Sequence, residues 1–373
     1  MKIGILGGGQ LARMMMEESH KYGFEFHILS EKENSPAGLI TKFEYAGDWN
    51  DEDTLLRFSD KCDLITLENE FIDHHKIRFL ENRGTSVFPS SEIVKLVQDK
   101  LFQKDYLRES GIPVAEFAKA DSKEDIYEFA SANSYPVILK SRTMGYDGKG
   151  NFTVEREDQV EEAFSVLSRR GELMCESFVM FEKEIATQVV RNASGEMKVY
   201  NVVETIQKDH ICNQVISSLG QFQNIKSKAE AIAAKITQGL NYTGVMGIEM
   251  FLNGEDILVN ELAPRVHNSG HYTIEACHTS QFENHIRAIL NFTPGSTDMI
   301  CDNAVMINIL GTRNGKAELK NAVELFKSEN VYLHIYGKSE TGIGRKMGHI
   351  TVLNNDLRKA IELAGKSRDI IDI

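Results

Sequence analysis

The first ninety residues alternate short apolar runs with longer amphipathic stretches. Apolar runs at 2–7, 24–30 and 62–68 have the length of buried strands, and a shorter one follows at 85–90. The stretch 10–23 has helical spacing and ends at a glycine, which is a common helix terminator. Strands that alternate with helices form βαβ units, so this part is predicted to be a parallel sheet flanked by helices.

The remaining chain changes pattern twice. Residues 91–113 have the spacing of one helix, opened by a serine cap and ended by Gly111 and Pro113. Residues 115–180 combine strand-like and helical stretches, which predicts a small α+β unit. From 181 to 373 strand-like runs dominate, with helices near 226–240 and 280–291.

Composition excludes several classes of protein. The chain is 42% hydrophobic and 26% charged, as in ordinary globular proteins, and its net charge of −13 argues against nonspecific binding to nucleic acid or anionic membranes. The five cysteines include no C-x-x-C pair, which favours free thiols in a reducing compartment. No apolar run is long enough for a membrane span or a signal peptide. These features predict a cytoplasmic protein.

The opening glycine turn allows two interpretations. Gly7-x-Gly9-x-x-Ala12 is close to the dinucleotide-binding fingerprint, in which Glu31 or Glu33 would bind the ribose hydroxyls of NAD. The alternative is a tight strand-to-helix turn whose helix N-terminus faces some other anion.

A second glycine-rich loop, at 145–150, follows the strand that ends at Lys140. It does not match a P-loop, but a flexible loop between two strands can cover a triphosphate and donate backbone N–H groups to it. Lys140 would then contact phosphate oxygens. The alternative is a mobile hairpin with a solvated lysine, against which Tyr146 and Asp147 count.

Two glutamates face each other in a predicted hairpin. Strand-like runs flank a turn that contains Asn253-Gly254, and if the hairpin centres near Glu255, Glu249 and Glu261 lie almost directly opposite each other. Opposed like charges are destabilising in a half-buried sheet, and Mg²⁺ would remove that penalty, with Asn260 as a further ligand. A one-residue change of register would instead send one glutamate to solvent.

Two polar clusters follow this hairpin. The turn 265–271 gathers polar side chains, among which Arg265 suits the grip of a carboxylate or bicarbonate. Lys338, Arg345 and Lys346 flank glycines between two later strands and form a candidate phosphate site. The simpler alternatives are a structural histidine in the first cluster and a solvated hairpin tip in the second.

Four segments together carry a resemblance to a known family. "RTMGYDGKG", "GIEMF", "NELAPRVHNSGH" and "GRKMGH" closely resemble the N5-carboxyaminoimidazole ribonucleotide synthetases, ATP-grasp enzymes of purine biosynthesis. The resemblance implies a fold that is α/β and α+β in three domains. These are an N-terminal parallel-sheet domain at 1–98, a central lid at 99–180 and a C-terminal mixed-sheet domain at 181–373. It also suggests a homodimer.

The resemblance implies an ATP- and Mg²⁺-dependent ligase. Bicarbonate would be joined to the amine of 5-aminoimidazole ribonucleotide through carboxyphosphate, with release of ADP and phosphate. Other hypotheses are a different ATP-grasp ligase, such as a formate-dependent glycinamide ribonucleotide transformylase, and a noncatalytic nucleotide-binding module. An NAD-dependent oxidoreductase would explain only the first thirty residues.

Matching the family's motifs implies roles for individual residues. ATP would be bound by Lys100, Lys140, Gly145, Tyr146, Asp147, Gly148, Lys149, Gly150, Glu176, Ser177, Phe178, Val179, Glu184, Gln207, Asn260 and Glu261. Mg²⁺ would be bound by Glu249 and Glu261, and catalysis would use Arg265, His267, Lys338, Tyr146 and Asp147. The ribonucleotide would be bound by Gln10, Glu68, Asn268, Arg345 and Lys346.

The chain departs from the family pattern at two places. Gln207 stands where a nucleotide-contacting histidine is common, and His210 where glycine is common. Gly342 and Ile343 replace an Arg-Pro pair before "GRKMGH". These departures leave the nucleotide affinity and the identity of the ribonucleotide open.

Overall fold

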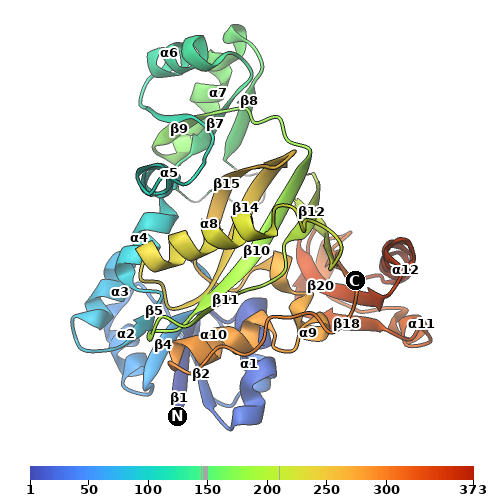
Figure 1. The fold of residues 1–373 in the computed structure, drawn as a ribbon. Helices are drawn as coiled ribbons and strands as arrows, with labels where there is room; N and C mark the ends of the chain where they lie inside the picture. The colour runs from blue at the N-terminus through green and yellow to red at the C-terminus, as the bar shows by residue number, and fades with distance from the viewer. Residues whose placement is uncertain (144, 146–149, 210) are drawn as a thin grey trace.

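The computed structural model describes residues 1–143, 145, 150–209 and 211–373. Within these residues three main sheets follow one another along the chain, each with its own helices (Figure 1). The described helices are all too short or too polar to span a lipid bilayer.

The N-terminal sheet is parallel, as predicted. Its strands β1 to β5 lie in the order β3-β2-β1-β4-β5, and their bounds are Lys2–Leu6, Glu25–Ser30, Glu44–Ala46, Leu64–Leu67 and Val87–Phe88. The flanking helices α1, α2 and α3 span Gln10–Ser19, Glu52–Ser59 and His74–Glu81, with short 3₁₀ turns at His20–Tyr22 and Gly38–Ile40. The predicted termination at Gly23 is confirmed, because this glycine has a φ of 70°.

The single helix predicted over 91–113 is wrong. The chain forms two helices, α4 at Ser91–Gln98 and α5 at Lys100–Glu109. Asp99 between them is extended, with φ −103° and ψ 111°, and its carboxylate accepts the backbone N–H of Leu101 at 2.9 Å. The same carboxylate binds the guanidinium of Arg142, so a distant partner and a new N-cap together stabilise the break.

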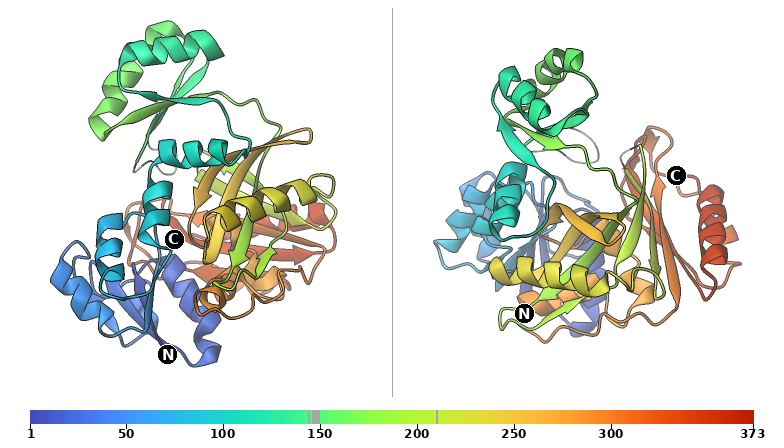
Figure 2. Two further views of the ribbon diagram at one scale, coloured as in Figure 1. Left: turned by 60° about the vertical axis from the view of Figure 1, so that its left-hand side comes forward. Right: turned by 45° about the horizontal axis from the view of Figure 1, so that its top comes forward.

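The small sheet is antiparallel, in the order β6-β9-β7-β8. Its strands span Phe117–Ala120, Leu173–Ser177, Val137–Ser141 and Asn151–Val154 in that spatial order. Helices α6 and α7, at Lys123–Asn133 and Val160–Leu167, cover it, with 3₁₀ turns at Glu157–Gln159 and Ser168–Arg170. In both views of Figure 2 this unit projects from the body that the other two sheets form.

The large sheet runs in the order β15-β14-β10-β12-β13-β16-β20-β18, and β11 pairs with β10. Its strands β10 to β16, β18 and β20 span Lys183–Arg191, Met197–Val199, Val203–Lys208, Ile211–Ser218, Gly244–Asn253, Asp256–Ala263, Asn303–Leu310, Val331–Ile335 and Lys346–Asn354. The predicted mixed sheet is wrong, because every described pairing is antiparallel. Short connections between successive strands, such as the turn after β14, require that direction.

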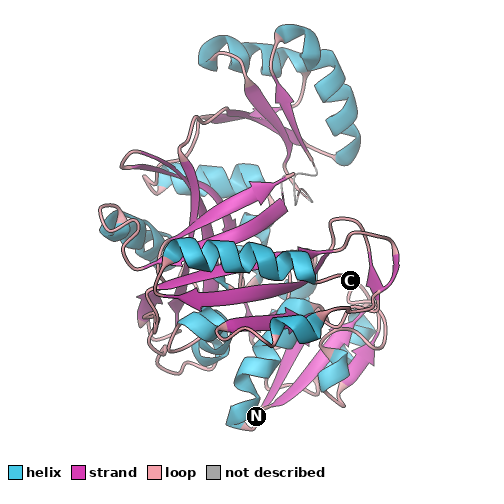
Figure 3. Ribbon diagram, turned by 90° about the vertical axis from the view of Figure 1, so that its right-hand side faces the viewer, coloured by secondary structure: helices cyan, strands magenta, loops and turns pink. Residues whose placement is uncertain are grey.

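Helices cover the large sheet on both faces. Their bounds, from α8 to α12, are Lys226–Gly239, Thr273–Ala276, Gln281–Ile289, Ala322–Leu325 and Leu357–Ile370, with a 3₁₀ turn at Asn268–Gly270 and a small β17–β19 ladder at Gly315–Lys316 and Glu340–Thr341. In Figure 3, α12 lies across one face of the strands. The sequence pattern singled out neither β13 nor α12 as an element.

One apolar cluster joins the first sheet to the last. It combines Met14 and Met15 of α1 with Phe282 and Ile286 of α10, all of which are buried. Close packing of this shared cluster fixes the N-terminal unit against the large sheet. Residues of the two units can therefore contribute to one site.

Candidate active site

The opening glycine turn accommodates a carboxylate of the protein itself. The backbone N–H of Leu11 donates to Oε1 of Glu68 at 3.4 Å, and a Cβ built on Gly9 would lie 2.1 Å from that oxygen. Gly7, with φ 104°, is equally crowded by Glu68. The space that a pyrophosphate would need at the N-terminus of α1 is thus occupied. Glu31 and Glu33 are exposed, so the structure offers no support for NAD.

A buried carboxylate lies between two lysines. Glu176 on β9 is 2% exposed, and its oxygens accept from Lys104 of α5 at 2.6 Å and from Lys140 at the end of β7. Although burial alone would raise the pKa of Glu176, the two ammonium groups lower it to about 2. Burial lowers the pKa of Lys104. The cluster brings Lys140 together with Glu176 and adds Lys104, which the sequence did not single out.

The two glutamates of the predicted hairpin are directly paired. Glu249 of β14 faces Glu261 of β15, which confirms the predicted register. The reason differs from the expectation, since the turn pairs residues 253 and 256 and a bulge next to Glu249 shifts the register by one. Without that bulge Glu249 would face Asn260. Bulges near sites commonly re-aim side chains in this way.

Lys100 partly compensates this carboxylate pair. Its ammonium lies 2.5 Å from Oε1 of Glu261. Burial acts to lower the pKa of this ammonium, whereas the neighbouring glutamates act to raise it. Burial, followed by repulsion from Glu261 and Glu184, raises the pKa of Glu249 to about 7. Two opposed carboxylates with one cation form a set of hard oxygen donors that lacks positive charge, and such a set suits Mg²⁺.

Arg265 and His267 approach the same carboxylates. Arg265 forms a two-pronged ion pair with Glu70, in which Nη2 donates to Oε1 at 2.9 Å and Nε donates to Oε2. Burial and the charge of Arg265 lower the pKa of His267 to about 3, so its imidazole is neutral. Its Nδ1 accepts the backbone N–H of Ser269 at 3.3 Å. The ring proton therefore lies on Nε2, which is 3.5 Å from Glu249.

The predicted phosphate cluster is partly brought to this site. Lys338 donates to the backbone oxygen of Lys346 at 2.7 Å, and Lys346 is close enough to act electrostatically on Glu249 and His267. Arg345 is exposed and donates to the backbone oxygen of Glu340 at 2.7 Å. These residues come from β20 and the loop before it.

Asn268 and Gln10 have different surroundings. The amide of Asn268 exchanges hydrogen bonds with Asn308 at 3.0 and 2.7 Å, so its side chain already has two partners. Gln10 is half-buried at the first position of α1 and follows the glycines that pack on Glu68.

The remaining ATP-binding predictions fall in two groups. Asn260 and Glu261 line a small cavity with Lys100, Lys140 and Glu176, so this part of the prediction is spatially coherent. The second group lies along three strands and the loop after β9. Ser177 ends β9, and Phe178, which is 42% exposed, and Val179 follow it. Glu184 lies on β10, and Gln207 lies on β12 beside a bulge. Gly145 and Gly150 are described, whereas Tyr146, Asp147, Gly148, Lys149 and His210 lie outside the described residues.

A larger cavity of about 200 Å³ lies next to these groups. Residues from all three sheet units line it, including Glu70, Gln98, Lys100, Arg142 and Glu261. Charged and apolar walls meet there beside the carboxylate pair, which is the usual character of a small-molecule site.

Several residues at this site were not predicted from the sequence. Glu70, Gln98, Asp99, Lys104 and Arg142 each pair with a residue of another element. Two of them had a local signal in the sequence: Glu70 belongs to the acidic repeat in "TLENEF", and Arg142 is a basic residue two positions after Lys140. The partners of all these residues lie 26 to 195 residues away along the chain, and no periodicity predicts such pairings.

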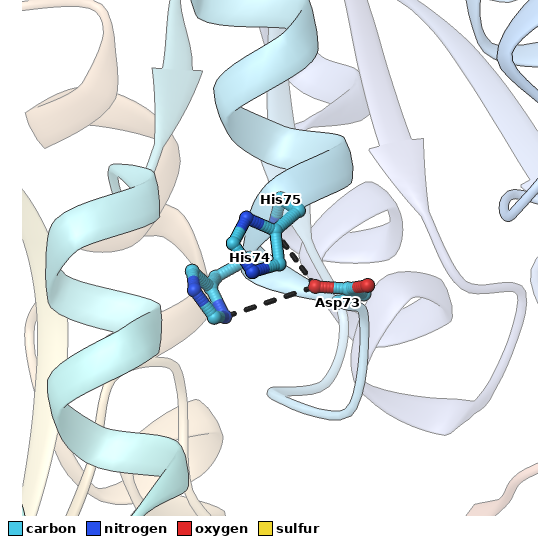
Figure 4. A group of neighbouring side chains, drawn as sticks. All are labelled: Asp73, His74 and His75. Carbon is cyan, nitrogen blue, oxygen red and sulfur yellow. Dashed lines mark hydrogen bonds and ion pairs between the residues drawn. The ribbon is translucent and has the colours of Figure 1, made fainter.

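A separate group of possible metal ligands lies at the start of α3 (Figure 4). Asp73, His74 and His75 bring one ligand atom each within 4.8 Å of one another. The carboxylate of Asp73 already accepts the backbone N–H of His75 at 2.9 Å and acts as the N-cap of α3. Helix capping accounts for this arrangement without a metal.

Family models match consecutive parts of the chain. The ribonucleotide synthetase preATP-grasp domain matches residues 1–98, and the ATP-grasp domain matches 105–282. The phosphoribosylaminoimidazole carboxylase C-terminal domain matches 304–363. The first match coincides with the N-terminal sheet unit, the second spans the small sheet and strands β10 to β15 of the large sheet, and the third covers most of the rest of the large sheet.

Known proteins resemble the chain over nearly its whole length. The N5-carboxyaminoimidazole ribonucleotide synthase of Bacillus subtilis is 36% identical over 94% of this chain and 91% of its own. The phosphoribosylaminoimidazole carboxylase of Ogataea methanolica is 39% identical over 95% of this chain. This chain spans 67% of that protein, and 65% and 64% of two further fungal carboxylases.

A solved structure shares the same fold. The N5-carboxyaminoimidazole synthase of Aspergillus clavatus, in complex with ADP and 5-aminoimidazole ribonucleotide, superposes with a TM-score of 0.90. The two sequences are 32% identical, and the match covers 99% of this chain and 98% of the other.

Proposed function

This chain belongs to the family of N5-carboxyaminoimidazole ribonucleotide synthetases, ATP-grasp ligases of purine biosynthesis, and we propose that it carboxylates 5-aminoimidazole ribonucleotide with bicarbonate. The reaction consumes ATP, requires Mg²⁺ and releases ADP and phosphate. One observation carries the proposal: the opposed carboxylates of Glu249 and Glu261 lie between the lysine cluster around Glu176 and the Arg265–His267 pair. A metal-dependent phosphoryl transfer needs that order of groups.

The nucleotide side is built from the lid and the edge of the large sheet. Lys140 and Lys100 contact the phosphates of ATP, and Gly145 to Gly150 cover them. The segment from Glu176 to Val179 lines the adenine, and Glu184, Gln207 and Asn260 complete the binding of the nucleotide. The two lysines are supported by their places beside Glu176 and Glu261. In the structure both lysines pair with carboxylates, so their ammonium groups exchange these partners for phosphate oxygens when ATP binds.

Glu249 and Glu261 hold the Mg²⁺. The opposed pair fits a divalent ion, since repulsion between the two groups raises the pKa of Glu249 to about 7 in its buried setting and Lys100 supplies only one positive charge. When bound, the ion neutralises charge on the phosphates during transfer.

The acceptor side uses residues of the turn after β15 and of β20. Arg265, neutral His267 and Lys338 bind bicarbonate and the carboxyphosphate formed from it, while Tyr146 and Asp147 complete the catalytic set. Lys346 and Arg345 bind the phosphate of the ribonucleotide, and Gln10, Glu68 and Asn268 contact the rest of it. The support is the proximity of Lys346 to Glu249 and His267.

The chemistry needs alignment and charge neutralisation more than a protein nucleophile. An oxygen of bicarbonate attacks the terminal phosphorus of ATP, and the bond to ADP breaks. The amine of the ribonucleotide then attacks the carbon of carboxyphosphate, releases phosphate and loses one proton. The lid excludes water, which would otherwise hydrolyse the mixed anhydride.

We propose the same three-part division for the function: residues 1–98 contact the ribonucleotide, 99–180 form the lid, and 181–373 carry the metal and phosphate sites. The enzyme works as a homodimer in the cytoplasm. All five cysteines are free, which suits a reducing compartment.

Phosphate release tests the function. Purified protein with Mg²⁺ and ATP should release phosphate only when both 5-aminoimidazole ribonucleotide and bicarbonate are present. Release that instead requires formate and glycinamide ribonucleotide would identify a different ATP-grasp ligase. No release with either pair, from protein that binds ADP, would indicate a noncatalytic module.

A further inference from the structure

An ion pair crosses from the N-terminal sheet unit to the candidate bicarbonate site. Glu70 lies in the loop after β4, and Arg265 lies in the turn after β15. Their side chains are 19% and 17% exposed, and the two hydrogen bonds between them lock the guanidinium plane onto the carboxylate. Paired bonds of this kind fix orientation as well as distance.

The pair determines which edge of the guanidinium stays open. Arginine has five N–H groups. Nε and Nη2 each donate one to Glu70, and Nη1 donates one to the backbone oxygen of Val266 at 3.1 Å. Among the described residues this leaves one N–H on each Nη for a ligand. Two such donors match the planar oxygens of bicarbonate.

Glu70 is itself held in place. The side-chain amide of Gln98, at the end of α4, donates to the backbone oxygens of Glu70 at 2.6 Å and of Ile72 at 2.7 Å. Burial would raise the pKa of Glu70, but Arg265 holds it below its usual value, so the carboxylate is ionised. The loop therefore presents a rigid, charged acceptor.

We propose that Glu70 is a positioning residue that turns the free edge of Arg265 toward bicarbonate, so the N-terminal unit helps to build the bicarbonate site. The inference rests on the proposed function and goes beyond it, since the predicted contacts of this unit are to the ribonucleotide. Glu70 lines the neighbouring cavity, but in this role it does not bind bicarbonate itself. Its effect passes entirely through Arg265.

The variant Glu70→Gln tests this role, because it keeps the size of the side chain and removes its charge. We expect the KM for bicarbonate to rise and kcat to fall, with a combined loss of about 10- to 100-fold, as for a misplaced binding group. Affinity for ADP, measured by calorimetry, should change less than about twofold, since ADP does not contact Arg265. Bicarbonate is varied in degassed buffer, with phosphate release as the readout.

Glu70→Asp is the conservative partner. It keeps the charge but shortens the reach, so the loss should be smaller than in Glu70→Gln, and it provides the same test if the glutamine variant fails to fold. Equal losses in both variants would contradict the need for the charge.

Glu283→Gln is the matched control. Glu283 is also a buried carboxylate between the N-terminal unit and the large sheet, where it binds Lys21 and Tyr22. Its replacement should lower the melting temperature and leave the KM for bicarbonate within about twofold. The proposal is overturned if Glu70→Gln behaves like Glu283→Gln, or if it loses ADP binding together with bicarbonate. Absence of bicarbonate-dependent release in the unmodified enzyme would instead refute the proposed function.

Discussion

Two carboxylate clusters lie side by side in this molecule with opposite charge balance. Around Glu176 one buried carboxylate meets two ammonium groups, those of Lys104 and Lys140. Around Glu249 and Glu261 two carboxylates share the ammonium of Lys100. The pKa of Glu176 falls to about 2, whereas that of Glu249 rises to about 7.

This difference in charge predicts the charge of the ligand that each cluster binds. The lysine-rich cluster has one surplus positive charge and suits an anion such as a phosphate group. The glutamate pair lacks positive charge and suits a cation. Mg²⁺ and ATP together supply both, which explains why the two clusters adjoin.

Loss of a glutamate from the Glu249–Glu261 pair should have the largest effect on the reaction rate. We expect Glu261→Ala to lower the rate of phosphate release by at least about 1000-fold, because metal stabilisation of the transition state amounts to several kcal/mol. Glu255→Ala is the matched control, since Glu255 is exposed in the turn of the same hairpin. A variant at Glu261 with more than a tenth of the normal rate would end the assignment of the metal to this pair.

Removal of a lysine from the positively charged cluster around Glu176 should chiefly affect the stability of the fold. Lys104→Met leaves buried Glu176 with Lys140 alone, and we expect a loss of about 3 kcal/mol in the free energy of unfolding, measured with urea. Lys123→Met breaks an exposed ion pair with Glu161 and should cost at most about 1 kcal/mol. Equal losses would show that the buried cluster is no more important than a surface pair.

The titration of Glu249 should produce the smallest effect. Its folded pKa of about 7 lies above the value of 4.5 expected in the unfolded chain, so the folded protein binds the extra proton. Without metal, this group's stabilising contribution is therefore present below about pH 4.5 and is lost as the pH rises to about 7. Protons compete with Mg²⁺, so its affinity should fall up to about tenfold from pH 7 to pH 6.

Melting temperatures in EDTA and in Mg²⁺ measure both trends. The difference between the unmodified protein and Glu249→Gln isolates this carboxyl from all other titrating groups. A difference that is independent of pH between 5 and 8 would show that Glu249 titrates normally.

Local pattern was enough for most elements. Alternation of apolar runs and amphipathic stretches predicted β1, β2, β4 and α1, because hydrophobic period reflects burial directly. It failed at Asp99, where a cap and an ion pair with Arg142 break an apparently continuous helix. It also missed β13 and α12, although α12 carries a local helix signal, with Asp356 as its N-cap and a buried face at Ala360, Ala364 and Ser367.

The sequence by itself determined the parallel N-terminal unit, the hairpin that carries Glu249 and Glu261 and the residues that resemble the family. Each depends on neighbours along the chain or on spacing within one hairpin. Tertiary structure alone decided which charges meet. Glu68 fills the opening glycine turn, Lys104 shares Glu176, and Glu70 orients Arg265 across 195 positions of sequence. Such contacts depend on how the sheets dock, and docking is set by the packing of the whole apolar core.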